Sequence, residues 1–304
     1  MYFFKSRRIW DNWSKASTPD FQDLLLFLKP GEHTSVPFTS RLLNASQKPD
    51  SHMLNRNTVL IERKSGRITG ALMLSPEGIV CPVLSNESSL EPLHRMVNSS
   101  SYYKKKYLTL MGAVDDISEF EKLFTNKKRL SVDYKLLCSR SDSLSDRINS
   151  YLNLKEASRM DITIHRALNS DLEKLMPLRK AYEIEEVILN PNNFNEGSCR
   201  RRFALTIDEQ AVFYAENRGI PIATSCINAC GIDWFQIGGV YTLPEYRGRG
   251  ISAMLMARLA EHAVSTQKDL TLFVKKDNPA AIKLYSNCGF KKMDGYRISY
   301  LESR

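Results

Sequence analysis

Hydrophobic and polar positions in the C-terminal half of the chain follow two periods, which predict alternating strands and helices. Residues 161–166 alternate with the period of a strand, whereas Leu172, Leu175, Met176 and Arg179 follow the spacing of a helix. The expected elements are a strand at 161–166, helices starting at Asn169 or Ser170 and at Glu196, strands at 211–216, 222–227 and 234–242, a helix carrying Ile251, Leu255 and Leu259, a strand at 270–274, and a helix carrying Ala281 and Tyr285. This order predicts an α/β fold.

The N-terminal half shows a similar but less explicit pattern. Its expected elements are strands at 58–63, 68–74, 78–83 and 108–112, and a helix at 117–124. A polar, serine-rich stretch at 139–146, running on to Arg159, is typical of a linker. Since 304 residues exceed the usual size of one domain, we expect a first domain at 1–140, a linker at 141–159 and a second domain at 160–304.

Composition and charge exclude several classes of function. The net charge is +9, but the basic clusters at 104–106, 127–129 and 200–202 are short and separate, which favours a solvated surface over a nucleic-acid interface. No apolar run approaches the roughly 20 residues that span a bilayer, and the apolar part of the first residues is too short for a signal peptide, so we expect a cytoplasmic protein with no membrane contact. The six cysteines and five histidines are scattered, and no metal site is expected.

The stretch from Val240 to Ser252 carries the clearest chemical signal. It joins an expected strand to an expected helix through a turn that contains Gly248 and Gly250. Glycine allows positive φ and close approach of the backbone, and the following helix directs its unpaired N–H groups and positive dipole end at the same point. This predicts an anion site. The spacing matches neither a Walker A loop nor a dinucleotide fingerprint.

A second pattern follows farther along the chain, after the expected helix and strand. It consists of Asn278, Ala281, Tyr285 and the pair Gly289-Phe290. Ala281 and Tyr285 are four residues apart and share one helical face, so a small side chain precedes a phenol by one turn.

Together the two patterns resemble the GNAT superfamily of acyl-CoA-dependent acyltransferases, whose loop reads Arg/Gln-x-x-Gly-x-Gly/Ala. Ser252 departs from that loop pattern, because it stands where the family has glycine or alanine. The resemblance covers residues 161 to 301 and is closest to bacterial tandem proteins that place a degenerate GNAT-like domain ahead of an active one. It implies a mixed, mostly antiparallel central sheet flanked by helices, and two tandem GNAT-like domains.

The resemblance also implies how the cofactor is held. Acetyl-CoA is the expected cosubstrate, its pyrophosphate bound by the loop and its pantetheine arm lying beside the strand that precedes it. The pair Gly238-Gly239 is typical of a bulge in that strand. The expected cofactor-binding residues are Val240, Thr242, Arg247, Gly248, Arg249, Gly250, Ile251, Ser252, Asn278, Ala281 and Tyr285.

An N-acetyltransferase is therefore the expected activity, in which a primary amine attacks the thioester directly. Tyr285 is the candidate acid for the leaving thiolate, and Glu185 or Glu186 is the candidate base. A small-molecule or peptide amine is the expected acceptor, and its identity and the oligomeric state are not predicted. In the N-terminal half, the turn at 113–116 is expected to replace the phosphate loop with two carboxylates, which leaves that half without cofactor.

Two other classes remain open. One is a protein that binds acyl-CoA without turnover, and the presence of Asn278 and Tyr285 disfavours it. The other is a tandem-GNAT transferase that takes aminoacyl groups from charged tRNA, which suits the basic charge. Such enzymes generally lack the CoA loop, so residues 247–252 disfavour this class too.

Overall fold

The chain divides into two compact units. The structure is a computed structural model that describes residues 12–46, 58–93, 105–125, 127–141, 161–188 and 190–303. The N-terminal unit comprises Met1–Leu136 together with Asp294–Arg304, and the C-terminal unit comprises Leu137–Met293. The last strand thus belongs largely to the N-terminal unit, although the sequence placed it in the second domain. Residues 142–159 of the expected linker lie outside the described residues.

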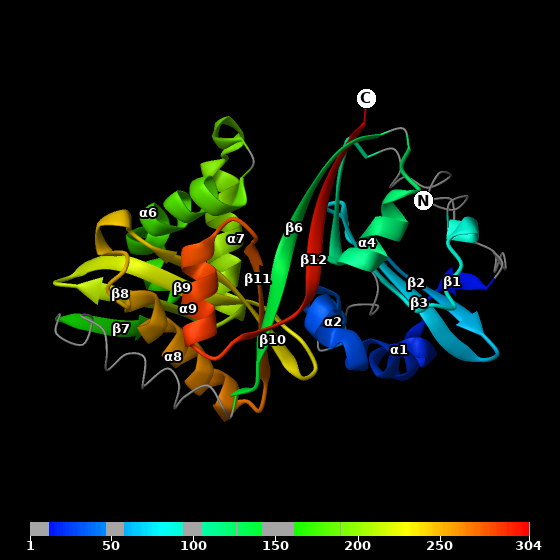
Figure 1. The fold of residues 1–304 in the computed structure, drawn as a ribbon, viewed down its shortest axis with the longest axis horizontal. Coiled ribbons are helices and arrows are strands. Elements are labelled where there is room, and N and C mark those ends of the chain that lie inside the picture. Colours follow the sequence, from blue (N-terminus) through cyan, green and yellow to red (C-terminus); the bar gives the residue numbers. More distant parts are fainter. Residues whose placement is uncertain are drawn as a thin grey trace. The chain divides into compact units, whose positions relative to one another are not determined.

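The C-terminal unit is built on a mixed sheet with strand order β11-β10-β9-β8-β7 (Figure 1). The β7–β8, β8–β9 and β9–β10 pairs are antiparallel, and the β10–β11 pair is parallel. The elements are β7 (Ile162–Arg166), α6 (Leu172–Tyr182), α7 (Glu196–Glu209), β8 (Val212–Asn217), β9 (Ile220–Cys230), β10 (Trp234–Thr242), α8 (Ile251–Ser265), β11 (Asp269–Lys275) and α9 (Pro279–Asn287). The α/β class and the mostly antiparallel sheet are confirmed.

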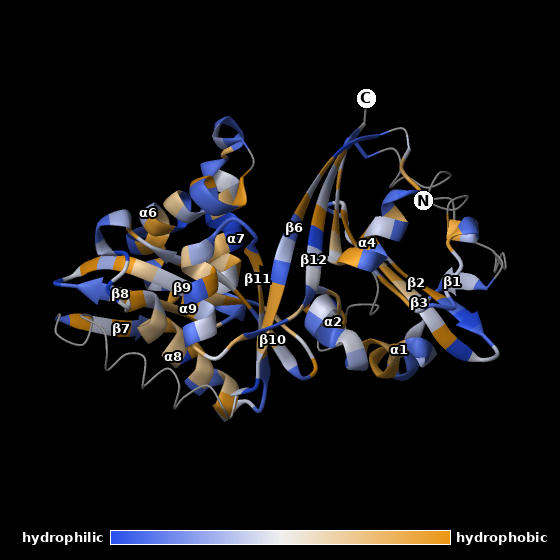
Figure 2. Cartoon of the chain, viewed as in Figure 1, coloured by the Kyte–Doolittle hydropathy of each residue, from blue (hydrophilic) through white to orange (hydrophobic). Residues whose placement is uncertain are grey.

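Helices cover both faces of this sheet because neighbouring strand residues point to opposite sides. On β9, Cys226 packs with α6 and α7, whereas Ile227 packs with α8 and α9. Figure 2 shows bands of hydrophobic residues along both the strands and the helices, interrupted by hydrophilic ones. Both faces of the sheet are therefore covered by packed helices.

The N-terminal unit repeats this arrangement. Its strand order is β1-β2-β3-β4-β5-β12-β6, and its β4–β5 pair is parallel. Helices α1 and α2 pack on one face and α4 on the other. The elements are β1 (Trp13–Lys15), α1 (Phe21–Leu28), α2 (Glu32–Ser46), β2 (Thr58–Lys64), β3 (Arg67–Leu74), β4 (Ile79–Leu84), β5 (Tyr107–Ala113), α4 (Val114–Glu121), β6 (Lys127–Ser139) and β12 (Lys291–Ser303).

The turn at 113–116 lies at a different point of the fold from the one the sequence suggested. The parallel pair β4–β5 matches the parallel pair β10–β11, so the counterpart of the phosphate loop follows β4, not β5. Asp115 and Asp116 instead lie in the first turn of α4, where the positive end of the helix dipole favours carboxylates. The prediction that this turn replaces the phosphate loop was therefore wrong.

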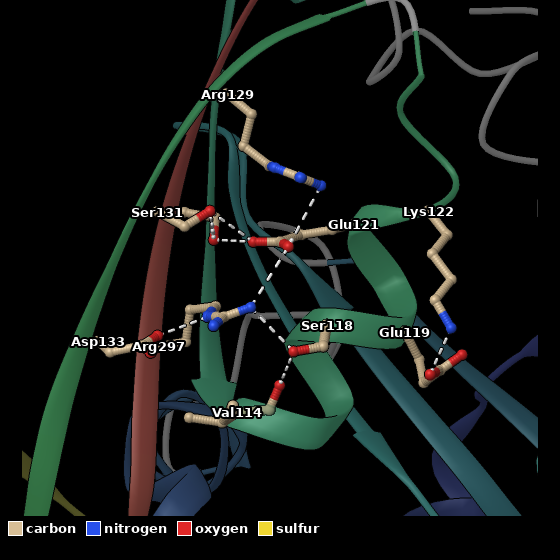
Figure 3. Close-up of polar contacts among 10 residues, drawn as sticks. Val114, Ser118, Glu119, Glu121, Lys122, Arg129, Ser131, Asp133 and Arg297 are labelled. Carbon is tan, nitrogen blue, oxygen red and sulfur yellow. Dashed lines mark hydrogen bonds and ion pairs between the residues drawn. The ribbon is translucent and has the colours of Figure 1, made fainter.

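A buried carboxylate, Glu121, joins β12 and β6 to α4 (Figure 3). It is 5% exposed and accepts hydrogen bonds from Ser131 and Ser299. It also pairs with Arg129 at 3.3 Å and with Arg297 at 3.6 Å. Arg297 in turn donates to Asp133 at 2.6 Å and to Ser118 at 2.9 Å. The carboxylate thus has partners on both strands, and they pin the last strand of the chain into the N-terminal unit.

We predict that Glu121→Ala destabilises the N-terminal unit by about 2–4 kcal/mol, because two arginines and two hydroxyls lose a buried acceptor. Urea unfolding followed by tryptophan fluorescence measures the loss, since Trp13 belongs to this unit's core. Glu119→Ala is the matched control. Glu119 is on the same helix, but it is 54% exposed and pairs only with Lys122 among the described residues, so we expect a change within about 0.5 kcal/mol. Equal effects of the two substitutions would contradict the prediction.

The stability of the N-terminal unit should also depend on Asp116. Burial raises the pKa of Asp116 to about 7, repulsion from Asp115 and Asp294 adds to the rise, and a hydrogen bond from the backbone of Leu84 opposes it. A carboxyl with a raised pKa stabilises the fold while it is protonated, and that stability is lost as pH rises from about 4 to 7.

We therefore predict that Asp116→Asn is more stable than the wild type by about 1–3 kcal/mol above pH 7, and equal to it near pH 4. The range allows for the partial exposure of the side chain. Urea midpoints measured from pH 4 to pH 8 test whether the stability difference grows with pH. Glu119→Gln removes an equal charge from the exposed side of α4 and should show no such dependence on pH. A constant difference between Asp116→Asn and wild type across this range would refute the assignment.

Candidate functional site

The centre of the site is the point where β10 and β11 part. Their parallel pairing runs from Trp234 with Asp269 to Gln236 with Thr271. Beyond that point the described strands continue, to Thr242 and Lys275, with no further pairing to each other. Backbone groups along the second half of β10 therefore face an opening on the β11 side.

A bulge in β10 coincides with this opening. The β9 partner of Gly238 is Cys226 and that of Tyr241 is Thr224, so β10 has one residue more than β9 between these pairs. Gly239 has a φ of +58°, and a Cβ atom there would lie 2.8 Å from the sulfur of Cys226. Only glycine fits this position, which confirms the bulge expected at Gly238-Gly239.

The loop after β10 presents unpaired backbone N–H groups. Gly248 has a φ of +78° with open space where a Cβ would be, and Gly250 has a φ of +94° and forms the N-cap of α8. Among the described residues, no acceptor pairs with the amides of residues 248–252. These amides lie at the positive end of a 15-residue helix, which makes the loop suited to an anion.

The two arginines of the loop have different environments. The guanidinium of Arg247 donates to the carbonyl of Thr242 at 2.9 Å and to Glu185 at 2.8 Å, and it lies 5.4 Å from the ring centre of Tyr241. Arg249 is half-buried, lies 5.6 Å from the ring of Tyr246 and forms no ion pair with the described residues. Arg247 thus braces the loop against the end of β10, and Arg249 leaves its charge available to a ligand.

Ser252, the residue that departs from the family pattern, has a defined partner. Its hydroxyl lies 2.8 Å from that of Thr242. The bond links the first turn of α8 to the end of β10. The extra hydroxyl is therefore accommodated inside the protein and does not block the loop.

The second pattern forms the start of α9. The side chain of Asn278 caps the helix by accepting the N–H of Ala281 at 3.0 Å. Tyr285 lies one turn beyond Ala281 in the same hydrophobic cluster and packs edge-on against Phe290. Its phenol makes no hydrogen bond to the described residues. Burial, with contributions from Tyr182, Cys288 and Glu186, raises the pKa of Tyr285 well above its ordinary value, so the phenol stays protonated.

The candidate bases lie on a short π-helix, Glu183–Val187, that continues α6. Glu185 accepts from Arg247 and from the hydroxyl of Tyr241 at 3.1 Å, and these bonds, the Arg247 bond foremost, lower its pKa. Glu186 instead pairs with Lys275 at 3.2 Å, at the end of β11. The two carboxylates thus point to different elements, and only Glu186 contributes to the raised pKa of Tyr285.

Several polar residues of this region have no signal in the sequence. Tyr182 contacts the bulge, Arg179 and Glu183 form a buried ion pair behind it, and Tyr241 and Lys275 hold the two candidate bases. Each contacts a residue far away in the chain or in a neighbouring helical turn, which the local sequence does not indicate. The clustering of charged and aromatic residues at 179–186 is a general sign of a polar site, but it assigns no partner.

Comparison with known proteins agrees with this geometry. Residues 176–290, which contain the bulge, the loop and α9, match the profile of the acetyltransferase (GNAT) family. The C-terminal half of the chain carries a GNAT acetyltransferase domain. No curated protein sequence matches the chain.

Solved structures extend the likeness of fold to the whole chain. A Drosophila protein superposes with a TM-score of 0.68 at 13% identity, over 96% of this chain and 98% of the other. A tandem GNAT protein from the clavulanic acid biosynthesis pathway gives 0.56 at 11%, over 96% and 98%. A GNAT-family acetyltransferase from Colwellia psychrerythraea gives 0.52 at 14%, over 96% and 99%. The tandem GNAT architecture is thus shared, whereas these identities carry no information on substrates.

Within the described segments, no group of histidine, cysteine, aspartate and glutamate side chains could hold a metal ion. None of the helices in the same segments has the length and hydrophobicity to cross a bilayer.

Proposed function

We propose that the C-terminal unit is an acetyl-CoA-dependent N-acetyltransferase that acts on a primary amine. Three features of one unit carry the proposal: parallel strands that part, a helix N-terminus whose amides have no acceptor among the described residues, and a protonated phenol with no hydrogen-bond partner among them. Each feature answers one chemical part of acetyl-CoA: the pantetheine, the pyrophosphate and the departing thiolate. The family of residues 176–290 supports the same reading.

Binding of the cofactor follows from the residues at these three places. The amides of residues 248–252 and the charge of Arg249 would hold the pyrophosphate. The free edge of β10 at Val240 and Thr242 would pair with the amides of the pantetheine arm, as an added strand does. Ala281 would leave room for that arm, because any larger side chain on this face of α9 would fill it.

Catalysis then depends on orientation and two proton transfers. The amine attacks the thioester carbonyl, the C–N bond forms as the C–S bond breaks, and Tyr285 supplies a proton to the thiolate. Glu186 is the better candidate to accept the ammonium proton. Its competitor, Glu185, is held by Arg247 and Tyr241, and its lowered pKa makes it a weaker base.

The N-terminal unit lacks the corresponding phenol. Phe120 occupies the same position relative to the start of α4 as Tyr285 does relative to the start of α9. Phe120 packs against Phe124 with a ring-centre distance of 5.8 Å, and Tyr285 packs against Phe290 with one of 6.0 Å. One catalytic site per chain therefore follows from the proposal.

A panel of primary amines, assayed with acetyl-CoA for thiol release, tests the activity, and calorimetry tests the stoichiometry. We expect one acetyl-CoA per chain and turnover with at least one class of amine. Two cofactor sites per chain, or binding without turnover across the panel, would contradict the proposal. The second outcome would point to a protein that binds acyl-CoA as a sensor.

For the loop, we predict that Arg249→Glu weakens acetyl-CoA binding by at least about tenfold, because it sets a carboxylate beside the pyrophosphate. Calorimetry measures the affinity. Arg258→Glu is the matched control, since Arg258 lies farther along α8 and pairs with Glu261 on the surface. We expect its affinity to stay within twofold of the wild type. Similar losses in both variants would show a general effect of charge and not a contact with the cofactor.

For the phenol, we predict that Tyr285→Phe lowers kcat about ten- to a thousandfold with little change in acetyl-CoA affinity. Because the pKa of Tyr285 is raised, the wild-type rate should not fall between pH 8 and pH 10 through ionisation of this group. Rapid-mixing kinetics under conditions where chemistry limits the rate provide the measurement. A variant as fast as the wild type would remove Tyr285 from the mechanism.

A further inference from the structure

A polar cluster lies beneath the bulge of β10, and the proposed mechanism does not use it. Arg179 and Glu183 form an ion pair at 2.8 Å, and their side chains are only 12% and 3% exposed. The guanidinium lies 5.2 Å from the ring centres of both Tyr182 and Phe203. Buried ion pairs are often no more stabilising than apolar residues of equal volume, so stability alone does not account for this pair.

The cluster reaches the site through one hydrogen bond. The N–H of Gly239 donates to the phenol oxygen of Tyr182 at 3.3 Å. Gly239 is buried and lies inside the bulge, between Gly238 and Tyr241, which both keep a register partner on β9. The phenol therefore satisfies a backbone donor that the bulge has removed from the sheet.

That bond restrains a segment of β10 whose backbone has high intrinsic conformational freedom. Two successive glycines have the largest conformational freedom of any dipeptide, and Gly239 already has a positive φ. The next residue is Val240, which the proposed function assigns to the pantetheine arm. Burial raises the pKa of Tyr182 to about 12, so the acceptor is a neutral phenol throughout the working pH range.

We propose that Tyr182 is a positioning residue of the acetyltransferase site. Its phenol fixes the Gly238–Gly239 peptide at the opening between β10 and β11. It thereby orients the next residues of β10, the strand edge along which the pantetheine and thioester would lie. Arg179 supports the ring of Tyr182, and Glu183 holds Arg179 in place. The inference rests on the proposed function. It adds a residue whose hydrogen bond is to the bulge and not to the phosphate loop or α9.

Tyr182→Phe tests the proposal because it keeps the ring and removes only the acceptor. We expect kcat/KM for acetyl-CoA to fall about tenfold and CoA affinity to fall by a similar factor. Adenosine 3′,5′-bisphosphate, the nucleotide part of CoA without the pantetheine, should bind as it does to the wild type. Loss of affinity for both ligands would indicate a general structural role and overturn the proposal. Wild-type kinetics in the variant would overturn it as well.

Tyr214→Phe is the control for the substitution itself. Tyr214 is a buried tyrosine of the same hydrophobic cluster, and its hydroxyl faces Lys174 instead of the bulge. Its removal should leave all three measurements unchanged. Glu183→Gln gives a second, independent variant: it weakens the hold on Arg179 and should lower CoA affinity in the same selective way, by a smaller factor.

The ligand comparison also separates this inference from the proposed function. If the wild type turns over no amine, the acetyltransferase proposal fails, yet CoA and the bisphosphate still report whether Tyr182 acts on the pantetheine side. If the wild type is active but Tyr182→Phe does not distinguish the two ligands, the positioning role fails alone.

Discussion

The site depends on the separation of two parallel strands. β10 and β11 pair only as far as Gln236 and Thr271, and every candidate residue is placed relative to the point where they part. The bulge at Gly239 shifts β10 at this point, and the loop and α8 follow from its end. α9 follows from the end of β11. A sheet that remained paired to its edges would satisfy the backbone groups that here remain available, so the opening itself creates the binding surface.

Two ion pairs connect the segment that carries the candidate bases to the phosphate loop and to the end of β11. The π-helix at Glu183–Val187 sends Glu185 to Arg247 in the loop and Glu186 to Lys275 at the end of β11. The same short segment therefore touches both strands beyond the point where they part. π-helical turns are frequently found at functional sites, because the extra residue redirects side chains that a regular helix would space differently. Movement of this segment would change the loop and the candidate base together.

Local patterns predicted those parts of the fold and site that local chemistry determines. Short apolar runs bounded by turn residues located β8 to β11, and the glycines at 248 and 250 located the loop, because positive φ favours that residue type. β6 and β12 were not predicted. Residues 291–303 carry many charged and polar side chains, and their partner strand, β5, lies far back in the chain. Likewise, nothing near Tyr182 in the sequence indicates that its phenol receives the N–H of Gly239.

The two units show how one topology can serve different purposes. Each has a parallel pair of strands followed by a helix, α4 after β5 and α9 after β11. On α9 the helix presents a phenol with no hydrogen-bond partner among the described residues, so none of their groups competes with a ligand for its proton. On α4 the polar group is Glu121, surrounded by two hydroxyls and two guanidinium groups that fill its acceptor sites. A carboxylate so completely paired cannot act on a ligand, but it can hold a strand, and it holds the one that ends the chain.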